Sequence, residues 1–136
     1  LKGSKLMAKT YIIQLIDTIN SLLYTSDEAE SENERISAAK AYISAHLTEK
    51  LTLDILAEAV FTDKFYLSHL FKKECGVSIK DYISMQRVAL AKNLIIGGNS
   101  ATEVYTECGF NDYSSFYRAF KKLSGKSPNE FFKGKR

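Results

Sequence analysis

The segment DKFYLSHLFKKECGVS at Asp63–Ser78 is repeated as DYSSFYRAFKKLSGKS at Asp112–Ser127, without a gap. Each copy opens with an aspartate, which often caps a helix N-terminus. Each copy also carries a glycine after its Phe-Lys-Lys triplet, where a helix commonly ends. The repeat therefore predicts two similar helices, ending at Gly76 and Gly125.

A short helix is predicted before each copy. Thr52 is the expected N-cap of LDILAEAV, and Ser100-Ala-Thr-Glu103 has the pattern of a capping box. A short helix, a tight turn and a second helix form the helix-turn-helix motif, whose second helix enters the DNA major groove. Residues 80–96 predict a long helix that joins the two motifs and ends at Gly97-Gly98.

The remaining sequence also predicts helices. Residues 34–47 carry one apolar stripe, and Ser127-Pro128-Asn129-Glu130 is a second capping box with proline at the first helical position. No segment alternates apolar and polar residues as a strand would. The predicted class is all-α: two helix-turn-helix subdomains joined by a long linker helix, about seven helices, plus an extra N-terminal helix. A stacked helical array is the less favoured alternative, since such arrays usually need about three or more units.

Three regions are predicted along the chain. Residues 1–24 include a helix over 5–24 with an apolar stripe, and residues 25–34 form an acidic linker. Residues 35–136 form the main domain, with helix-turn-helix motifs at about 52–75 and 100–124. The stripe fits either a coiled-coil dimer seam or the last helix of a sensory or dimerisation domain that the chain lacks. We favour the second interpretation, because a coiled coil of fewer than two heptads is only marginally stable on its own.

Composition limits the function classes. The sequence has no run of about 18 apolar residues, so no membrane span is predicted. Cys75 and Cys108 lack the spacing of metal ligands. His46 and His69 fall on different predicted helices, and no catalytic motif is present. We therefore expect a cytoplasmic protein that is not an enzyme and has no metal or cofactor. Residues 62–136 carry 13 basic and seven acidic side chains, whereas residues 1–61 carry six and nine. Positive charge on the repeated half is typical of a polyanion binder.

The segment GFNDYSSFYRAFKKLSGKSPNEFF (Gly109–Phe132) resembles the signature of the AraC/XylS family of bacterial transcription regulators. Leu51–Ile83 resembles the first helix-turn-helix unit of that family, and the similarity covers about residues 35–134. The resemblance implies a seven-helix domain whose linker helix holds two recognition helices in successive major grooves. It also implies promoter DNA and RNA polymerase as partners. The apolar stripe of residues 5–24 leaves a homodimer through the N-terminal region open. A helical protein-interaction module without DNA contact is the alternative function.

One face of each repeated helix is predicted to read bases. The candidates are Lys64, Phe65, Ser68 and His69 in the first copy, and Tyr113, Ser114, Tyr117 and Arg118 in the second. Arg118 is the strongest candidate, because arginine can bond guanine O6 and N7 together, with phosphate contact as its alternative. Phe65 packs on thymine methyl groups or, with the helix turned by one residue, belongs to the core. The residues predicted to face the core are Tyr66, Leu67, Leu70, Phe116, Ala119 and Phe120.

Backbone contacts are predicted at the helix ends. The lysine pairs Lys72-Lys73 and Lys121-Lys122 follow the base-reading faces, and either phosphate contact or plain solvation suits them. The amide groups near Thr52 and Ser100 are further phosphate candidates. Two positions depart from the family pattern: Phe61 replaces the usual turn glycine, and Tyr105 replaces a small alanine beside the second recognition helix.

Overall fold

The computed structural model describes residue 15 and residues 31–134. The chain divides into two compact regions, Leu1–Arg35 and Ile36–Arg136, and both helix-turn-helix units belong to the second. The predicted helix over 5–24 lies outside the described residues, apart from Leu15, as does most of the predicted linker. Residues 31–45 are helical, so the last four linker positions belong to this helix. Its glutamates are good helix formers, and a solvated composition does not exclude a helix.

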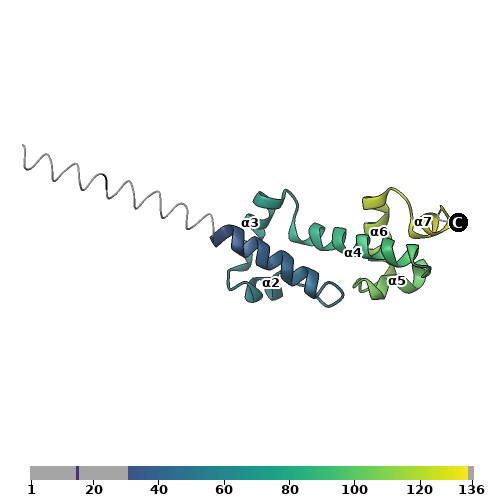
Figure 1. Cartoon of the computed structure of the whole chain (residues 1–136), viewed down its shortest axis with the longest axis horizontal. Helices are drawn as coiled ribbons and strands as arrows, with labels where there is room; N and C mark the ends of the chain where they lie inside the picture. Colours follow the sequence, from purple (N-terminus) through teal and green to yellow (C-terminus); the bar gives the residue numbers. More distant parts are fainter. Residues whose placement is uncertain (1–14, 16–30, 135–136) are drawn as a thin grey trace, which may run out of the picture. The chain divides into compact units, whose positions relative to one another are not determined.

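Residues 31–134 form seven helices and no strand, which confirms the predicted all-α class. After the helix over 31–45 come α2 (Leu53–Ala59), α3 (Lys64–Cys75), α4 (Ile79–Ile96), α5 (Ala101–Glu107), α6 (Tyr113–Ser124) and α7 (Pro128–Gly134). Figure 1 shows α4 running from α2 and α3 at one end to α5, α6 and α7 at the other. In this view α3 and α6 both lie above α4.

The helix ends follow the predicted signals with one exception. The Ile55 amide donates to Thr52 Oγ1 over 3.1 Å, and the Glu130 amide donates to Ser127 Oγ over 3.2 Å. Gly76 and Gly125 end α3 and α6 with the same φ of 76°. The predicted capping box at Ser100 is wrong in its side-chain part, because Ser100 makes no side-chain cap bond.

Ser100 makes different hydrogen bonds from the other N-cap residues. Its hydroxyl lies 3.3 Å from the Thr102 hydroxyl, and the Glu103 amide donates to the Ser100 backbone carbonyl over 3.1 Å. The first turn of α5 is therefore satisfied through the backbone, as tight first turns often are.

Two separate hydrophobic cores hold the helices together, and α4 contributes to both. Ile79 and Ile83 join the first core, which includes Ile36, Ala39, Ile43, Leu56, Ala57, Leu67, Leu70 and Phe71. The second core contains Val88, Ala91, Ile95, Val104, Cys108, Phe110, Phe116 and Phe120. Each helix-turn-helix unit thus packs around its own end of α4. Four further aromatic residues are partly buried and pack against these cores: Tyr42 and Tyr82 on the first, and Phe131 and Phe132 on the second.

The turns of the two units differ in their central residue. Phe61 adopts φ 55°, a left-handed conformation that side chains with a Cβ disfavour, and its ring is 92% exposed. Gly109 holds the corresponding place in the second turn with φ 99°. Phe61 therefore strains the first turn, and its exposed side chain does not pack against the core.

We expect Phe61→Gly to raise the free energy of unfolding by up to about 1 kcal/mol, because glycine adopts positive φ without the steric cost. Urea unfolding measures the change. Phe61→Ala is the matched control, since it removes the same exposed ring but keeps the cost of the left-handed backbone. A Phe61→Gly variant no more stable than Phe61→Ala would show that the turn is not strained.

Candidate nucleic-acid interface

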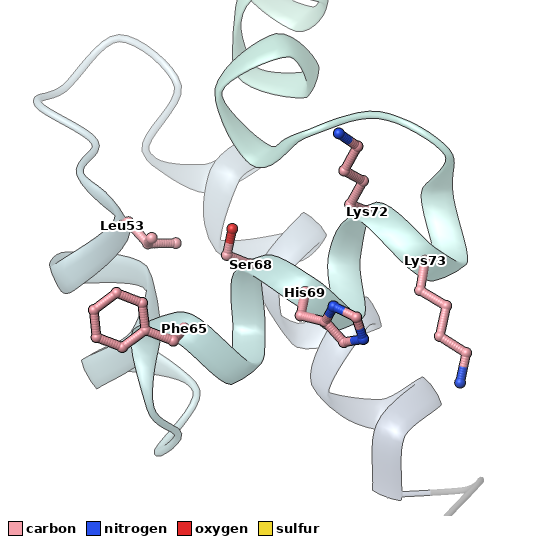
Figure 2. A pocket seen from close by; sticks show the side chains of 6 residues that line it. All are labelled: Leu53, Phe65, Ser68, His69, Lys72 and Lys73. Carbon is pink, nitrogen blue, oxygen red and sulfur yellow. The ribbon is translucent and has the colours of Figure 1, made fainter.

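One face of α3 lines an open groove of about 640 Å³. Figure 2 shows Phe65 beside Leu53 at one end of this groove, His69 farther along the helix, and the two lysines beyond it. The lining residues are Leu53, Phe65, Ser68, His69, Lys72 and Lys73. Five of these six were predicted from the sequence as DNA contacts. Leu53 was not, because it precedes the repeated segment and sits in an apolar run.

Phe65 is 73% exposed, so the one-residue rotation that would place it in the core is wrong. Tyr66 is 38% exposed, and the prediction that it belongs to the core is also wrong. The reason is that Leu67, Leu70 and Phe71 already fill the buried side of α3. Tyr66 lies at the edge of that buried stripe.

Lys64 lies away from the groove face. Its ammonium nitrogen pairs with the Asp54 carboxylate over 3.3 Å and lies 5.4 Å from the Phe65 ring centroid. It therefore ties the start of α3 to α2 and supports the Phe65 ring. Because the pair is largely exposed, its contribution to stability is small.

The corresponding face of α6 is more aromatic. Tyr113 packs against Tyr105, with ring centroids 5.8 Å apart at 85°, and against Phe116. Tyr105 is thus accommodated by an edge-on contact at the start of α6, where the family pattern has a small residue. Tyr117 is half-buried with Lys121 Nζ 5.9 Å from its ring centroid, whereas Ser114 and Arg118 are exposed.

A second and larger groove, of about 1000 Å³, is lined from both recognition helices. It takes Ser68 from α3, and Ser115, Arg118, Ala119 and Lys122 from α6. Its lining from α4 includes Lys80, Ser84 and Arg87, which the sequence analysis did not select. Their signal was weak, because a long helix joining two motifs looks like a spacer. Leu53 and Ser68 line both grooves, so the groove that contains Arg118 adjoins the one along the α3 face.

Aspartate caps fix the start of both recognition helices. Asp63 accepts from the amides of Phe65 and Tyr66 over 3.0 and 3.1 Å. Asp112 accepts from the Ser115 amide over 2.7 Å and from the Ser115 hydroxyl over 3.0 Å. The hydrogen bonds from Ser115 hold the pKa of the Asp112 carboxyl below its ordinary value of 3.8.

Within residue 15 and residues 31–134, no group of three or more His, Cys, Asp or Glu side chains has the arrangement of a metal site. No helix in this part of the chain has the length and hydropathy needed to span a membrane. Burial raises the pKa of the Cys108 thiol to about 11, so it stays protonated at neutral pH. Cys75 is half-buried at the end of α3.

Comparison with known proteins shows which proteins share this architecture. The helix-turn-helix domain family matches residues 56–134. The arabinose operon regulatory protein of Escherichia coli K12 is 34% identical over 128 residues, which cover 88% of this chain and 44% of that protein. The chain spans between 38% and 46% of three other curated relatives.

Solved structures agree with the match. The C-terminal domain of AraT, a response regulator from Geobacillus stearothermophilus, is 29% identical with a TM-score of 0.70, covering 74% of this chain and 84% of that one. The DNA-binding domain of AdpA, a global transcriptional factor solved with a target DNA, is 23% identical with a TM-score of 0.69. That alignment covers 73% of this chain and 90% of the other, and it supports the fold.

We expect the Asp112 cap to make stability depend on pH. Because the folded pKa is depressed, the carboxylate stabilises the fold above pH 3.8, and this contribution is lost as the pH falls below 3.8 through the folded pKa. Asp112→Asn keeps a capping side chain that does not titrate. The stability difference between wild type and this variant, from urea unfolding, should therefore shrink below pH 3.8. A difference that stays constant down to pH 3 or so would contradict the assignment.

Proposed function

Because the chain belongs to the AraC/XylS family of helix-turn-helix transcription regulators, we propose that α3 and α6 bind two successive major grooves of one DNA duplex. Successive grooves on one face of the duplex are one helical turn apart, about 34 Å. The site would be asymmetric, because the two helices present different side chains. The activity is binding, with regulation of transcription as its consequence.

One observation carries this proposal. Both helices contribute to the groove that runs along α4, α3 through Ser68 and α6 through Arg118 and Lys122, while the rest of the α3 face lines the smaller groove beside it. Equivalent caps and equivalent C-terminal glycines hold the two helices. A protein-interaction bundle would not require this matched pair of exposed faces.

In the first unit we assign base contacts to Phe65, Ser68 and His69. The exposed Phe65 ring suits a thymine methyl group, and the imidazole and hydroxyl suit base edges or phosphate. Lys64 is the weakest of the four predicted positions, because its ammonium group is paired with Asp54.

In the second unit we assign base contacts to Ser114, Tyr117 and Arg118. Arg118 is exposed and can bond guanine O6 and N7 together. Tyr113 is better suited to shaping the start of α6, since its ring packs on Tyr105 and Phe116.

Phosphate contacts are assigned to the exposed lysines in the last turns of α3 and α6, which are Lys72, Lys73, Lys121 and Lys122. Such contacts fix register and orientation without reading sequence. Thr52 and Ser100 stay predicted backbone contacts at the starts of α2 and α5. RNA polymerase as a partner, a homodimer through the N-terminal region and a cytoplasmic location also stay predictions.

The proposal is tested by selecting duplexes from a random pool with this chain, and then measuring affinity for the best duplex against salt. If each of the four lysines neutralises one phosphate, the slope of log K against log salt is about −3.6, a loss of ~100-fold from 50 to 200 mM. Affinity that is flat across this range would instead favour an apolar protein-interaction surface.

We expect Arg118→Ala to weaken binding to the selected duplex by about 5- to 150-fold, the loss of one bidentate guanine contact. Repeating the selection with the variant should show relaxed preference at one position of the second half-site. His69→Ala should act in the same way on the first half-site.

Lys121→Ala is the matched control for Arg118→Ala, because it removes a positive charge from the next helical turn. We expect it to weaken binding equally for all sequences and to reduce the salt slope by about 1. If Arg118→Ala also weakened binding equally for all sequences, Arg118 would be a phosphate contact and not a base contact.

A further inference from the structure

The middle of α4 lies between the two cores. Ile83 is the last residue of α4 in the first core, and Val88 is the first in the second core. Residues 84–87 belong to neither. A rotation or bend at this point would move α6 relative to α3 without opening either core, so a separate contact is needed to fix the two units.

Arg87 makes contacts in both units from this position. Its Nε donates to the Leu47 carbonyl over 3.0 Å, and its Nη2 donates to the Glu49 carbonyl over 2.9 Å. Leu47 packs against the first core. The guanidinium carbon also lies 5.8 Å from the ring centroid of Phe110, a member of the second core. The fork of donors suits two carbonyls, while the planar face suits a ring.

The loop that accepts these bonds is itself braced. The Glu49 amide donates to the His46 carbonyl over 3.0 Å, and His46 Nδ1 bonds with the Glu49 carboxylate. The loop follows the C-terminal end of the helix over 31–45, where carbonyl groups lack helical partners and attract positive charge. Arg87 therefore donates to carbonyl groups of a loop that has hydrogen bonds of its own.

Gly109 approaches the same site from the second unit. A Cβ atom at position 109 would lie 2.6 Å from the Leu47 carbonyl oxygen, 2.8 Å from Arg87 Nε and 3.1 Å from Thr48 Cα. The backbone of the second turn is thus in direct contact with the first unit's loop and with Arg87. The contact leaves no room for a side chain.

We propose that Arg87 is a positioning residue that fixes the orientation of α6 relative to α3, and thereby the half-site spacing that the domain accepts. Its consequence for DNA rests on the proposed two-groove binding, whereas the fixed orientation is a property of the protein alone. The two are tested separately.

The first test needs no DNA. Spin labels are attached at Glu74→Cys and Leu123→Cys, equivalent exposed positions near the ends of α3 and α6, in a Cys75→Ser background. Cys108 is fully buried with a raised pKa and should not be labelled. We expect one narrow distance distribution in the parent protein and a broader or shifted one in Arg87→Met.

Lys92→Met is the matched control. Lys92 is also on α4, but its ammonium nitrogen lies 6.0 Å from the centroid of Phe131, within the second unit. Its distribution should stay that of the parent. Arg87→Lys keeps the charge and serves if Arg87→Met fails to fold; a lysine cannot reproduce the fork, so partial broadening is expected. A distribution unchanged in the folded Arg87 variants would overturn the proposal, even if their thermal stability falls.

The second test uses the selected duplex with one base pair inserted between its half-sites. We expect the insertion to weaken wild-type binding roughly 10-fold, which is about the effect of losing the contacts to one base pair. The same insertion should weaken binding by Arg87→Met less than about threefold. Equal penalties in both proteins would overturn the link to spacing. If no duplex is bound at all, the proposed function fails, while the distance measurement still decides the role of Arg87.

Discussion

The structure depends on α4 supplying apolar side chains to two cores at once. Ile79 and Ile83 anchor one helix-turn-helix unit, and Val88, Ala91 and Ile95 anchor the other. Neither unit has an independent scaffold, because each closes its core on the same helix. The relative placement of the recognition helices therefore depends on how rigidly the middle of α4 is held. At this point Arg87 donates hydrogen bonds to the carbonyl groups of Leu47 and Glu49, in the loop after the helix over 31–45.

Much of the architecture could be predicted from the sequence, because its signals are local. The aspartates and glycines that start and end α3 and α6 act on their own helix turns, and the structure confirms them. The all-α class and the linker helix follow from the same signals. Ser100 shows the limit of this reasoning: the sequence pattern of a capping box was present, but the hydroxyl contacts Thr102 instead.

The candidate site was predicted less completely, because exposure is decided by neighbours distant in sequence. Helical periodicity identified the Phe65–His69 face but could not show that Lys64 would pair with Asp54 of α2. Likewise, Tyr113 has the right place in the repeat, yet Tyr105 packs against it from α5. Arg87 was missed altogether, since its carbonyl partners lie some 40 residues earlier in the chain.

The two turns also show that the internal repeat is not symmetric in its constraints. The first turn faces solvent at Phe61, so its sequence can change at only a local energetic cost. The second turn has the Leu47–Thr48 backbone against Gly109, so any side chain there displaces the neighbouring unit. The two motifs are consequently not interchangeable: the side chain at position 61 is exposed to solvent, whereas no side chain fits at position 109.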